Sequence, residues 1–350
     1  MLKKSGYILL PFSILYGGII RLRNQLFDKK FFRSASFDLP VICIGNLSVG
    51  GTGKSPMVEY LIEILRENYH VATLSRGYKR KTKGFFIANE NTQTSDIGDE
   101  PMQFYRKFSD ITVAVDEDRV MGIPKILNDR PATEIIILDD AFQHRQVTAG
   151  LNILLTEYHN LYSKDFMLPA GDLRDVKQSS ERADIIIVTK CDPDLDENER
   201  QKIIIELNPK PSQKLFFTAI EYNTPYHLFN KEKFNLDKET EVLLVSGIAN
   251  PKTLENEIES KVRFYKTLRF KDHHIFDTID LKKIKDEFLG LKSTKKIILT
   301  TEKDATRLLA FENGLKDLPI FILPMAHRFL FEDKNYFKKN ILEFVSSTKN

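Results

Sequence analysis

Short apolar runs alternate with longer amphipathic stretches through the first two thirds of the chain. Each run is rich in Val, Ile and Leu and is apolar at successive positions, which is typical of parallel strands buried on both faces by helices. Six such runs lie at residues 41–44, 71–74, 112–115, 135–138, 152–155 and 185–188. The alternation predicts an α/β fold built on a parallel sheet.

A polar stretch at residues 221–241 interrupts this alternation, and apolar runs resume at residues 242–245, 296–300 and 320–323. The second set of runs predicts a second, smaller α/β unit. We therefore expect an N-terminal segment over residues 1–40, a larger domain over residues 41–222 and a smaller C-terminal domain over residues 223–350.

The N-terminal segment is apolar almost throughout residues 7–20. A run of this length is too short for a transmembrane helix, which needs ~20 residues, and no small-residue cleavage site follows it, as a secretory signal would require. Residues 1–40 also carry seven Lys or Arg against two Asp, a net charge of +5. This combination favours a helix on an anionic membrane surface; a helix buried against the chain's own core is the alternative.

Composition narrows the class of protein. A chain of 350 residues with 42% hydrophobic and 29% charged residues is long enough for two globular domains. A net charge of +3, without interleaved basic and aromatic runs, argues against nucleic-acid binding. The two cysteines, Cys43 and Cys191, are far apart, which argues against a disulfide framework or a zinc site and favours a reducing compartment.

The first apolar run leads into a glycine-rich stretch, G-N-L-S-V-G-G-T-G-K-S-P, at residues 45–56. It follows the P-loop pattern G-x-x-x-x-G-K-[ST], except that Ser48 replaces the first glycine. A strand, a glycine turn and a helix opening near Ser55 direct backbone N–H groups toward an anion. Lys54 is expected to reach the β- and γ-phosphates of ATP, and Ser55 to bind Mg²⁺. The predicted loop consists of Ser48, Val49, Gly50, Gly51, Thr52, Gly53, Lys54 and Ser55.

A second acidic site is needed to hold the metal of a P-loop enzyme. Asp139 and Asp140 directly follow the run at residues 135–138, so they emerge at the carboxyl end of a strand, where ligands bind in open α/β sheets. Adjacent carboxylates at this position favour Mg²⁺. The loop and the acidic pair alone fit an ATPase, a GTPase or a kinase equally.

Several segments taken together resemble one family, the tetraacyldisaccharide 4'-kinases of lipid A biosynthesis. The resemblance covers most of the chain, to about Asp304, and rests on the set rather than on any one motif. The segments are the glycine-rich loop, S-R-G-Y at 75–78, G-D-E-P at 98–101, L-D-D-A-F-Q-H at 138–144, P-A-G-D-L-R-D at 169–175 and F-K-D-H-H at 270–274.

The resemblance implies transfer of the γ-phosphate of ATP to the 4'-hydroxyl of a tetraacyldisaccharide 1-phosphate, giving lipid IVA, with Mg²⁺ as the metal. It implies an acylated disaccharide lipid as substrate and a position at the cytoplasmic face of the bacterial inner membrane, on its surface. We expect neither nucleic acid nor an obligate protein partner.

Site residues follow from the same resemblance. Asp99 matches the family's catalytic aspartate, which accepts the proton of the sugar hydroxyl, and His273 matches the histidine that pairs with it, although the adjacent His274 is the alternative partner. Asp139 and Asp140 match the acidic pair that governs the metal, with Gln143 close to it. Candidates for binding phosphate or substrate are Arg76, Tyr78, Arg119, Arg174 and Asp175.

Two more segments are weaker. T-K-C-D at residues 189–192 is similar to the guanine-reading N-K-x-D of GTPases without its asparagine, so it is either a base contact or a strand-end turn, and T-E-K-D at residues 301–304 recurs in the family without a role that we can assign. The competing function is a membrane-associated P-loop switch ATPase without an acceptor alcohol. Asp99 and His273 decide against it, because a switch protein positions water and needs no base for a sugar hydroxyl. A metal-delivery GTPase would call for Cys- and His-rich clusters, which this chain lacks.

Overall fold

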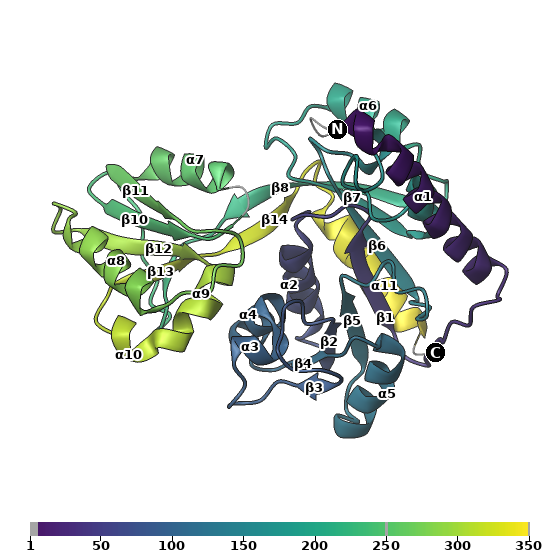
Figure 1. Ribbon diagram of the computed structural model, residues 1–350, viewed down its shortest axis with the longest axis horizontal. Helices are drawn as coiled ribbons and strands as arrows, with labels where there is room; N and C mark the ends of the chain where they lie inside the picture. Colours follow the sequence, from purple (N-terminus) through teal and green to yellow (C-terminus); the bar gives the residue numbers. More distant parts are fainter. Residues whose placement is uncertain (1–5, 249–250, 349–350) are drawn as a thin grey trace.

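The computed structural model describes residues 6–248 and 251–348, which form two units side by side (Figure 1). The larger unit is built on a mixed, mainly parallel sheet with the strand order β14-β8-β7-β6-β1-β5-β2-β4-β3. Only β3 and β14, at the two edges, run antiparallel to their neighbours. The strands are β1 (Val41–Asn46), β2 (Val71–Ser75), β3 (Phe86–Ile87), β4 (Thr112–Val115), β5 (Ile135–Asp139), β6 (Leu151–Glu157), β7 (Ile185–Thr189), β8 (Lys214–Tyr222) and β14 (Met325–Phe329).

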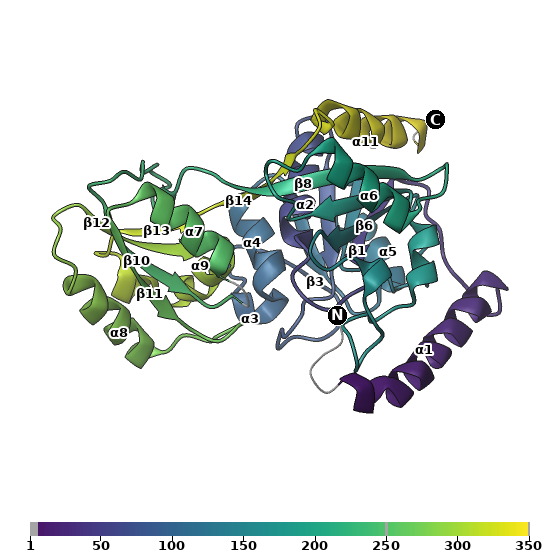
Figure 2. The same cartoon turned by 90° about the horizontal axis from the view of Figure 1, so that it is seen from above.

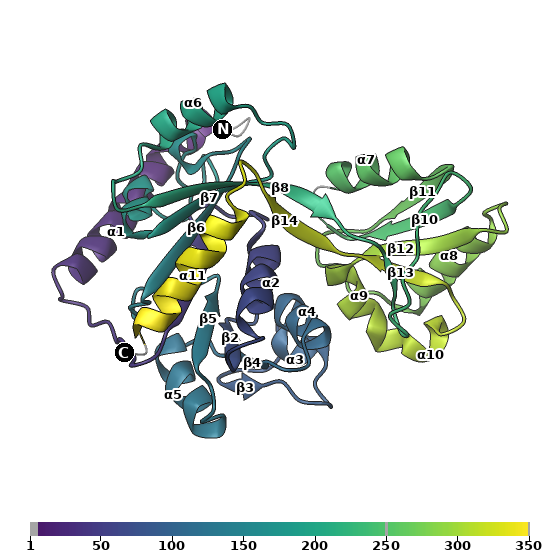
Figure 3. The ribbon, with the colours of Figure 1, turned by 180° about the vertical axis from the view of Figure 1, so that it is seen from behind.

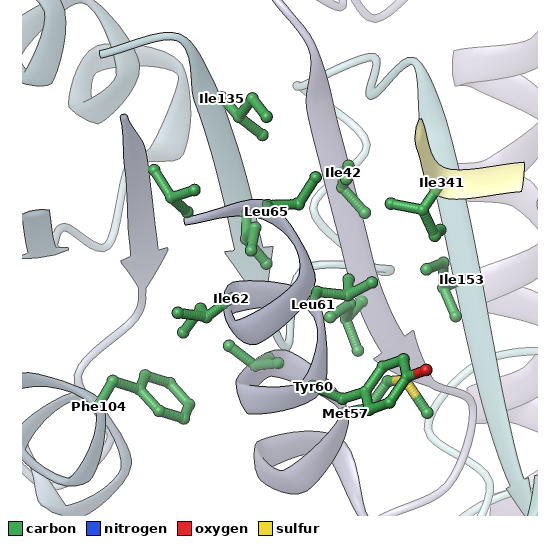
Figure 4. Packing of buried hydrophobic residues seen from close by; sticks show 14 of the residues in the cluster. Ile42, Met57, Tyr60, Leu61, Ile62, Leu65, Phe104, Ile135, Ile153 and Ile341 are labelled. Carbon is green, nitrogen blue, oxygen red and sulfur yellow. The ribbon is translucent and has the colours of Figure 1, made fainter. Parts of the chain in front are cut away.

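Helices cover both faces of this sheet. Alternate residues of β1 point to opposite sides: Ile42 packs with α2, α4 and α11, whereas Cys43 packs with α5 and α6. Figure 4 shows the first face, where Leu61 and Leu65 of α2 meet Ile42 and Ile341. The helices of this unit are α1 (Gly6–Asp28), α2 (Lys54–Leu65), α3 (Thr94–Ile97), α4 (Asp99–Lys107), α5 (Arg119–Asp129), α6 (Glu197–Leu207) and α11 (Lys334–Thr348), with 3-10 turns at Tyr162–Lys164 and Lys177–Arg182.

The smaller unit has a five-stranded sheet of order β11-β10-β12-β13-β9, in which only β9 is antiparallel. Helices α8 and α9 pack on one face of it and α7 on the other. Its strands are β9 (Tyr226–His227), β10 (Glu241–Ser246), β11 (Phe264–Arg269), β12 (Lys296–Thr301) and β13 (Ile320–Leu323); its helices are α7 (Lys252–Lys261), α8 (Thr278–Leu289), α9 (Glu302–Leu308) and α10 (Glu312–Leu315), with a 3-10 turn at Leu309–Phe311.

The predicted α/β class with a second, smaller α/β unit is confirmed. The predicted domain 223–350 differs from the structure at the end of the chain, because the last strand and the last helix belong to the larger unit. The chain enters the smaller unit after β8 and returns through β14, which pairs with β8, and α11 then packs on the larger sheet (Figure 3). Phe337, Ile341 and Val345 of α11 are fully buried there. Burial of these apolar residues against the larger core is why residues 325–348 belong to that unit.

Helix α1 lies along the outside of the larger unit, on the side opposite α11 (Figure 2). Five of its apolar residues point outward: they recur at intervals of four and three, so they share one face, and each exposes more than half of its surface. They are Ile8, Phe12, Leu15, Ile19 and Leu22. The alternative of a helix whose apolar residues are buried against the chain's own core is therefore not what the structure contains.

Polar residues attach α1 to the protein. The backbone N–H of Ala170 donates to Ser13 Oγ at 2.9 Å, the Tyr16 hydroxyl donates to the carbonyl of Arg174 at 3.1 Å, and Asn24 is buried. Of the helices within residues 6–248 and 251–348, none has the length and hydropathy needed to cross a bilayer. The helix thus presents an apolar stripe to its surroundings and its polar face to the protein.

Candidate active site

The glycine-rich loop joins β1 to α2, as its pattern predicts. Gly53 precedes the helix with a φ of 83°, in the left-handed region that favours glycine. Helix α2 begins at Lys54, and Pro56 lies in its first turn, where a missing N–H breaks no helical hydrogen bond. A Cβ added at Gly50 or Gly51 would meet no atom within 4 Å, so the loop has an open face that suits an anion.

Ser48, the departure from the strict P-loop pattern, is explained by its backbone. Residue 48 forms an antiparallel bridge with Leu173, and the N–H of Val49 donates to the carbonyl of Asp172 at 2.8 Å. Ser48 does not have a positive φ, so glycine is not required at this position. The first half of the loop is held by the P-A-G-D-L-R-D segment.

Buried side chains hold the second half of the loop. Asn46 Nδ2 donates to Thr52 Oγ1 at 2.9 Å, Thr189 Oγ1 donates to the carbonyl of Thr52 at 2.9 Å, and His327 Nε2 lies 2.9 Å from the carbonyl oxygen of Gly53. Thr189 begins the T-K-C-D segment, and its hydroxyl is engaged by the loop, which fits the strand-end interpretation. His327, from β14, belongs to no motif that the sequence offered.

The burial of His327 makes the fold sensitive to acid. Burial lowers the pKa of His327 to about 4 from 6.5, and its Nδ1 is hydrogen-bonded to the hydroxyl of Thr218 at 2.9 Å. Because the folded pKa is depressed, the unfolded chain binds more protons, and stability is lost as the pH falls from about 6.5 toward 4. Relative to His327→Gln, the wild type should lose about 3 kcal/mol of unfolding free energy over this window, measured by urea denaturation at several pH values. Parallel pH profiles for the two proteins would contradict this.

Asp139 ends β5 beside the loop and is almost fully buried. Ser75 Oγ donates to its Oδ2 at 3.3 Å, and its Oδ1 is buried without a hydrogen-bond partner among the described residues. Burial, with the charge of Asp140 adding to it, raises the pKa of Asp139 to about 7. A buried carboxylate oxygen without a donor fits a cation.

Asp140 has a different environment. Lys54 Nζ lies 3.6 Å from its Oδ1, and the Arg174 guanidinium contacts both of its oxygens. Burial opposes ionisation, but Lys54 and Arg174 outweigh it and lower the pKa of Asp140 to about 2. Arg174 also donates to Asn46 Oδ1 at 2.6 Å. Arg174, a candidate for binding phosphate, thus contacts Asp140 and the end of β1.

The donor set around the pair fits Mg²⁺. This ion takes one or two carboxylates and completes its shell with phosphate oxygens and water, so Asp139 and the Ser55 hydroxyl at the start of α2 are a sufficient protein contribution. Gln143 Nε2 donates to the carbonyl of Asn46 at 2.8 Å, which places Gln143 at the same edge. A cluster of three or more His, Cys, Asp or Glu able to hold a metal is not found in residues 6–248 and 251–348.

Asp99 and His273 come from different units and contact each other. Asp99 is the first residue of α4, and His273 follows β11. His273 Nδ1 lies 2.8 Å from Asp99 Oδ2, whereas His274 Nε2 lies 2.7 Å from Asp280. Of the two adjacent histidines, His273 is therefore the one that contacts Asp99.

The S-R-G-Y segment links this pair to Asp139 of the acidic pair. Ser75 contacts Asp139, and three residues later the Tyr78 ring lies edge-on to the His273 ring, with centroids 5.5 Å apart. Gly98 has a φ of 93°, and a Cβ there would lie 2.9 Å from the carbonyl oxygen of Tyr78. The S-R-G-Y segment therefore packs closely against the start of α4, which carries Asp99.

Two candidate arginines lie at the same edge of the sheet. Arg119 is buried at the start of α5, and its Nη2 is 3.5 Å from the carbonyl oxygen of Asp140. Burial lowers the pKa of Arg119, and the charge of Arg76 adds to this effect, so the two cations are neighbours. Arg76 is exposed. It is thus the more accessible of the two for a phosphate group.

Asp175 lies where a substrate cannot reach it, unlike the prediction. Its side chain is 0% exposed and accepts hydrogen bonds from Asn24 Nδ2 at 2.9 Å, Ser179 Oγ at 2.7 Å and Arg182 at 3.1 Å. A buried carboxylate already satisfied by these donors anchors α1 through Asn24. In the L-R-D motif, Arg174 therefore lies at the edge of the site, whereas Asp175 is a buried structural residue.

Three more charged residues flank Asp99 and His273, and the sequence assigned none of them a role. Lys303 Nζ lies 3.2 Å from His273 Nε2 and 3.0 Å from Glu100 Oε1. Arg307 Nε lies 3.5 Å from Asp99 Oδ2. The recurrence of T-E-K-D was the one sequence signal that pointed to this helix, α9.

Comparisons with known proteins agree over nearly the whole chain. Residues 6–346 match the family described as LpxK, tetraacyldisaccharide-1-P 4'-kinase. A tetraacyldisaccharide 4'-kinase of Bacteroides fragilis is 46% identical over 354 residues, which cover 98% of this chain and 94% of that protein. One of Flavobacterium johnsoniae is 46% identical over 345 residues, or 97% and 96% of the two chains. A crystal structure of LpxK from Aquifex aeolicus in complex with ATP has a TM-score of 0.78 at 31% identity and covers 97% of this chain and 99% of its own.

Proposed function

The chain belongs to the tetraacyldisaccharide 4'-kinase family, and from this premise we propose which of its residues carry out the reaction. It is a lipid A 4'-kinase: a transferase that moves the γ-phosphate of ATP, in the presence of Mg²⁺, to the 4'-hydroxyl of a tetraacyldisaccharide 1-phosphate. The prediction of a kinase is confirmed, and the switch ATPase is not favoured.

Asp99 is the group that receives the proton of the acceptor hydroxyl. The 4'-oxygen attacks the γ-phosphorus, the bond from that phosphorus to the bridging oxygen breaks, and ADP leaves with its electron pair. Such a transition state is loose, so the carboxylate acts mainly by orienting the hydroxyl and takes its proton late. The contact with His273 at 2.8 Å, made across the two units, is the observation that supports this assignment.

We assign the binding of ATP and its metal to the P-loop and to Asp139 and Asp140. Lys54 binds the β- and γ-phosphates together with the N–H groups of the loop, and Arg76 supplies a further exposed cation for phosphate. Asp139 and Ser55 would hold Mg²⁺, while Asp140 keeps Lys54 and Arg174 in place. Mg²⁺, when bound, neutralises charge on the phosphates and on the leaving oxygen.

The experiment that tests the function is transfer of labelled γ-phosphate from ATP to a tetraacylated disaccharide 1-phosphate in detergent micelles. Turnover of ATP should depend on the acceptor, because Asp99 needs a hydroxyl in place. Equal ATP hydrolysis with and without acceptor, and no label in the lipid, would contradict a kinase and favour the switch ATPase.

We further propose that α1 lies in the interface of the inner membrane on its cytoplasmic face. The outward stripe of apolar residues on α1 supports this, because an acylated acceptor is drawn from a bilayer and burial of the stripe in the acyl boundary would hold the enzyme there. ATP reaches the site from the cytoplasmic side.

This proposal predicts a loss of vesicle binding in the double variant Phe12→Ser, Ile19→Ser. Each side chain contributes ~1.5 kcal/mol or more when buried, so partitioning to anionic vesicles should fall roughly 100-fold, measured by co-sedimentation. A matched control is Ile205→Ser, at an isoleucine of α6 that is 70% exposed. Unchanged partitioning of the α1 variant, or an equal loss in the control, would argue against the interface.

A further inference from the structure

The Nε2 atom of His273 faces the ammonium of Lys303 at 3.2 Å, while its Nδ1 faces Asp99 at 2.8 Å. An ammonium group can only donate hydrogen bonds, so Nε2 must be the acceptor and carry no proton. The proton of a neutral imidazole then sits on Nδ1 and points at Asp99. We propose that Lys303 is a positioning residue that holds His273 in this neutral Nδ1–H form; its catalytic consequence rests on the proposed role of Asp99.

Charged groups surround His273 on every packed element. Helix α4 brings Asp99 and Glu100, and α9 brings Lys303 and Arg307; the chain of His273 itself brings Asp272, whose Oδ2 lies 3.9 Å from Nε2. The Tyr78 ring covers one edge of the imidazole. Of the three carboxylates, Asp272 is the one that lies near Nε2, and the ammonium of Lys303 is closer to that nitrogen.

Lys303 is held both by contacts of its ammonium group and by the anchoring of the helix on which it lies. Its ammonium also contacts Glu100 Oε1 at 3.0 Å, and Lys303 lowers the pKa of Glu100 although burial opposes this. Its helix is anchored to the larger unit, because the Thr94 hydroxyl donates to the carbonyl of Thr306 at 2.8 Å. Lys303 therefore lies on α9 but is held by α4, the helix that carries Asp99.

The buried first turn of α9 is also held in place by hydrogen bonds and ion pairs. Asp304 accepts from the N–H of Gly247 at 3.0 Å and from the Thr301 hydroxyl at 2.7 Å, which fixes the first turn of the helix. Lys107 Nζ lies 2.8 Å from Glu302 and 2.7 Å from Glu59, so α9, α4 and α2 share one ion-pair network. The T-E-K-D segment thus holds the ammonium of Lys303 in register with His273.

Whether the His273 ring is neutral or doubly protonated affects Asp99, the proposed base. A neutral Nδ1–H group orients Asp99 by a hydrogen bond, whereas an imidazolium would also place a full positive charge beside the carboxylate that receives the proton. The Lys303 ammonium, as a donor to Nε2, occupies the lone pair to which a second proton would add. Removal of Lys303 would let Nε2 take a second proton, directed at Asp272.

The first test uses the wild-type protein and no turnover. Long-range proton–nitrogen correlation spectra of the imidazoles, with the His273 signals identified by their loss in His273→Gln, should show an unprotonated Nε2 and a protonated Nδ1 at neutral pH. An unprotonated Nδ1, or two protonated nitrogens, would overturn the proposal. Because no activity is measured, this result stands or falls independently of the role of Asp99.

The second test compares Lys303→Met with Lys303→Arg. In the methionine variant kcat should fall roughly 10-fold, a small part of the ~10²–10⁴-fold that acid–base catalysis contributes, and the acid limb of its pH profile should move to higher pH, because Nε2 is then open to a proton. The KM for ATP should stay unchanged, and the arginine variant should recover the wild-type acid limb. Lys316→Met, at an exposed lysine of the same unit, is the control. An unmoved acid limb in Lys303→Met would overturn the proposal, even if kcat fell.

Discussion

Replacing Asp99 with alanine is expected to lower phosphate transfer by roughly 10²–10⁴-fold, the usual contribution of a positioned base. The carboxylate is 2.8 Å from His273 and 3.5 Å from Arg307, so its loss removes the group that these two residues orient. ATP should still bind, because the P-loop belongs to a different part of the sheet. The measurement is kcat with saturating acceptor, together with the Kd for ATP by calorimetry.

A matched control for this variant is Asp110→Ala, because Asp110 is an exposed carboxylate near the far end of α4 that pairs only with Arg66 among the described residues. It should keep wild-type kcat, since exposed ion pairs contribute little. Wild-type turnover in Asp99→Ala would remove Asp99 from the mechanism, whereas lost ATP binding would indicate damage to the fold.

Lys54→Ala should reduce turnover by roughly 10²–10³-fold, the effect of losing one preorganised donor at developing charge. Lys54 begins α2 and lies 3.6 Å from Asp140, so its ammonium is held beside the loop by a carboxylate whose pKa is lowered by Lys54 and Arg174. Unlike Asp99→Ala, this variant should also bind ATP more weakly, because the role proposed for Lys54 is to contact the phosphates before and during transfer.

The contrast between the two variants is the informative result. Lys210→Ala, at a half-exposed lysine that pairs with Glu181 on the surface, should leave both ATP affinity and turnover unchanged. If Lys54→Ala kept both quantities at wild-type values, the glycine-rich loop would not be the phosphate site.

The parts of the site that are local in sequence could be predicted from it. A loop such as that at residues 45–56 forms from consecutive residues, and its glycines and lysine carry their geometry with them. The same holds for Asp139 and Asp140, since a carboxylate that follows an apolar run must emerge at the end of a strand. Even Ser48, which broke the pattern, needed only its own backbone to explain it.

Features that depend on packing between distant segments could not be predicted in this way. His327 supports the loop from β14, and Lys303 reaches His273 from α9, so no spacing along the chain relates them to their partners. Asp175 shows the reverse case, because its motif gave no sign that the side chain is turned inward toward α1. The choice between His273 and His274 likewise required the smaller unit to be placed against α4.

Helix α1 illustrates a limit of hydrophobic pattern itself. An apolar stripe at residues 8–22 indicates one face of a helix but not whether that face is directed inward or outward. The polar residues on the opposite face, Ser13 and Asn24, decide it, because both are buried against the protein. Because the polar side of α1 packs against the protein, its apolar stripe faces the surroundings.

The return of the chain through β14 bears on how the protein is completed during synthesis. Strand β14 pairs with β8 from Tyr222 to Thr218, and α11 fills the core beside Phe216, yet both are made after the whole smaller unit. A nascent larger unit therefore has an open sheet edge at β8 and an uncovered apolar face beneath α11, features that favour aggregation. The smaller unit, contiguous in sequence, can be finished first, so the unit that begins earlier on the ribosome is the one that closes last.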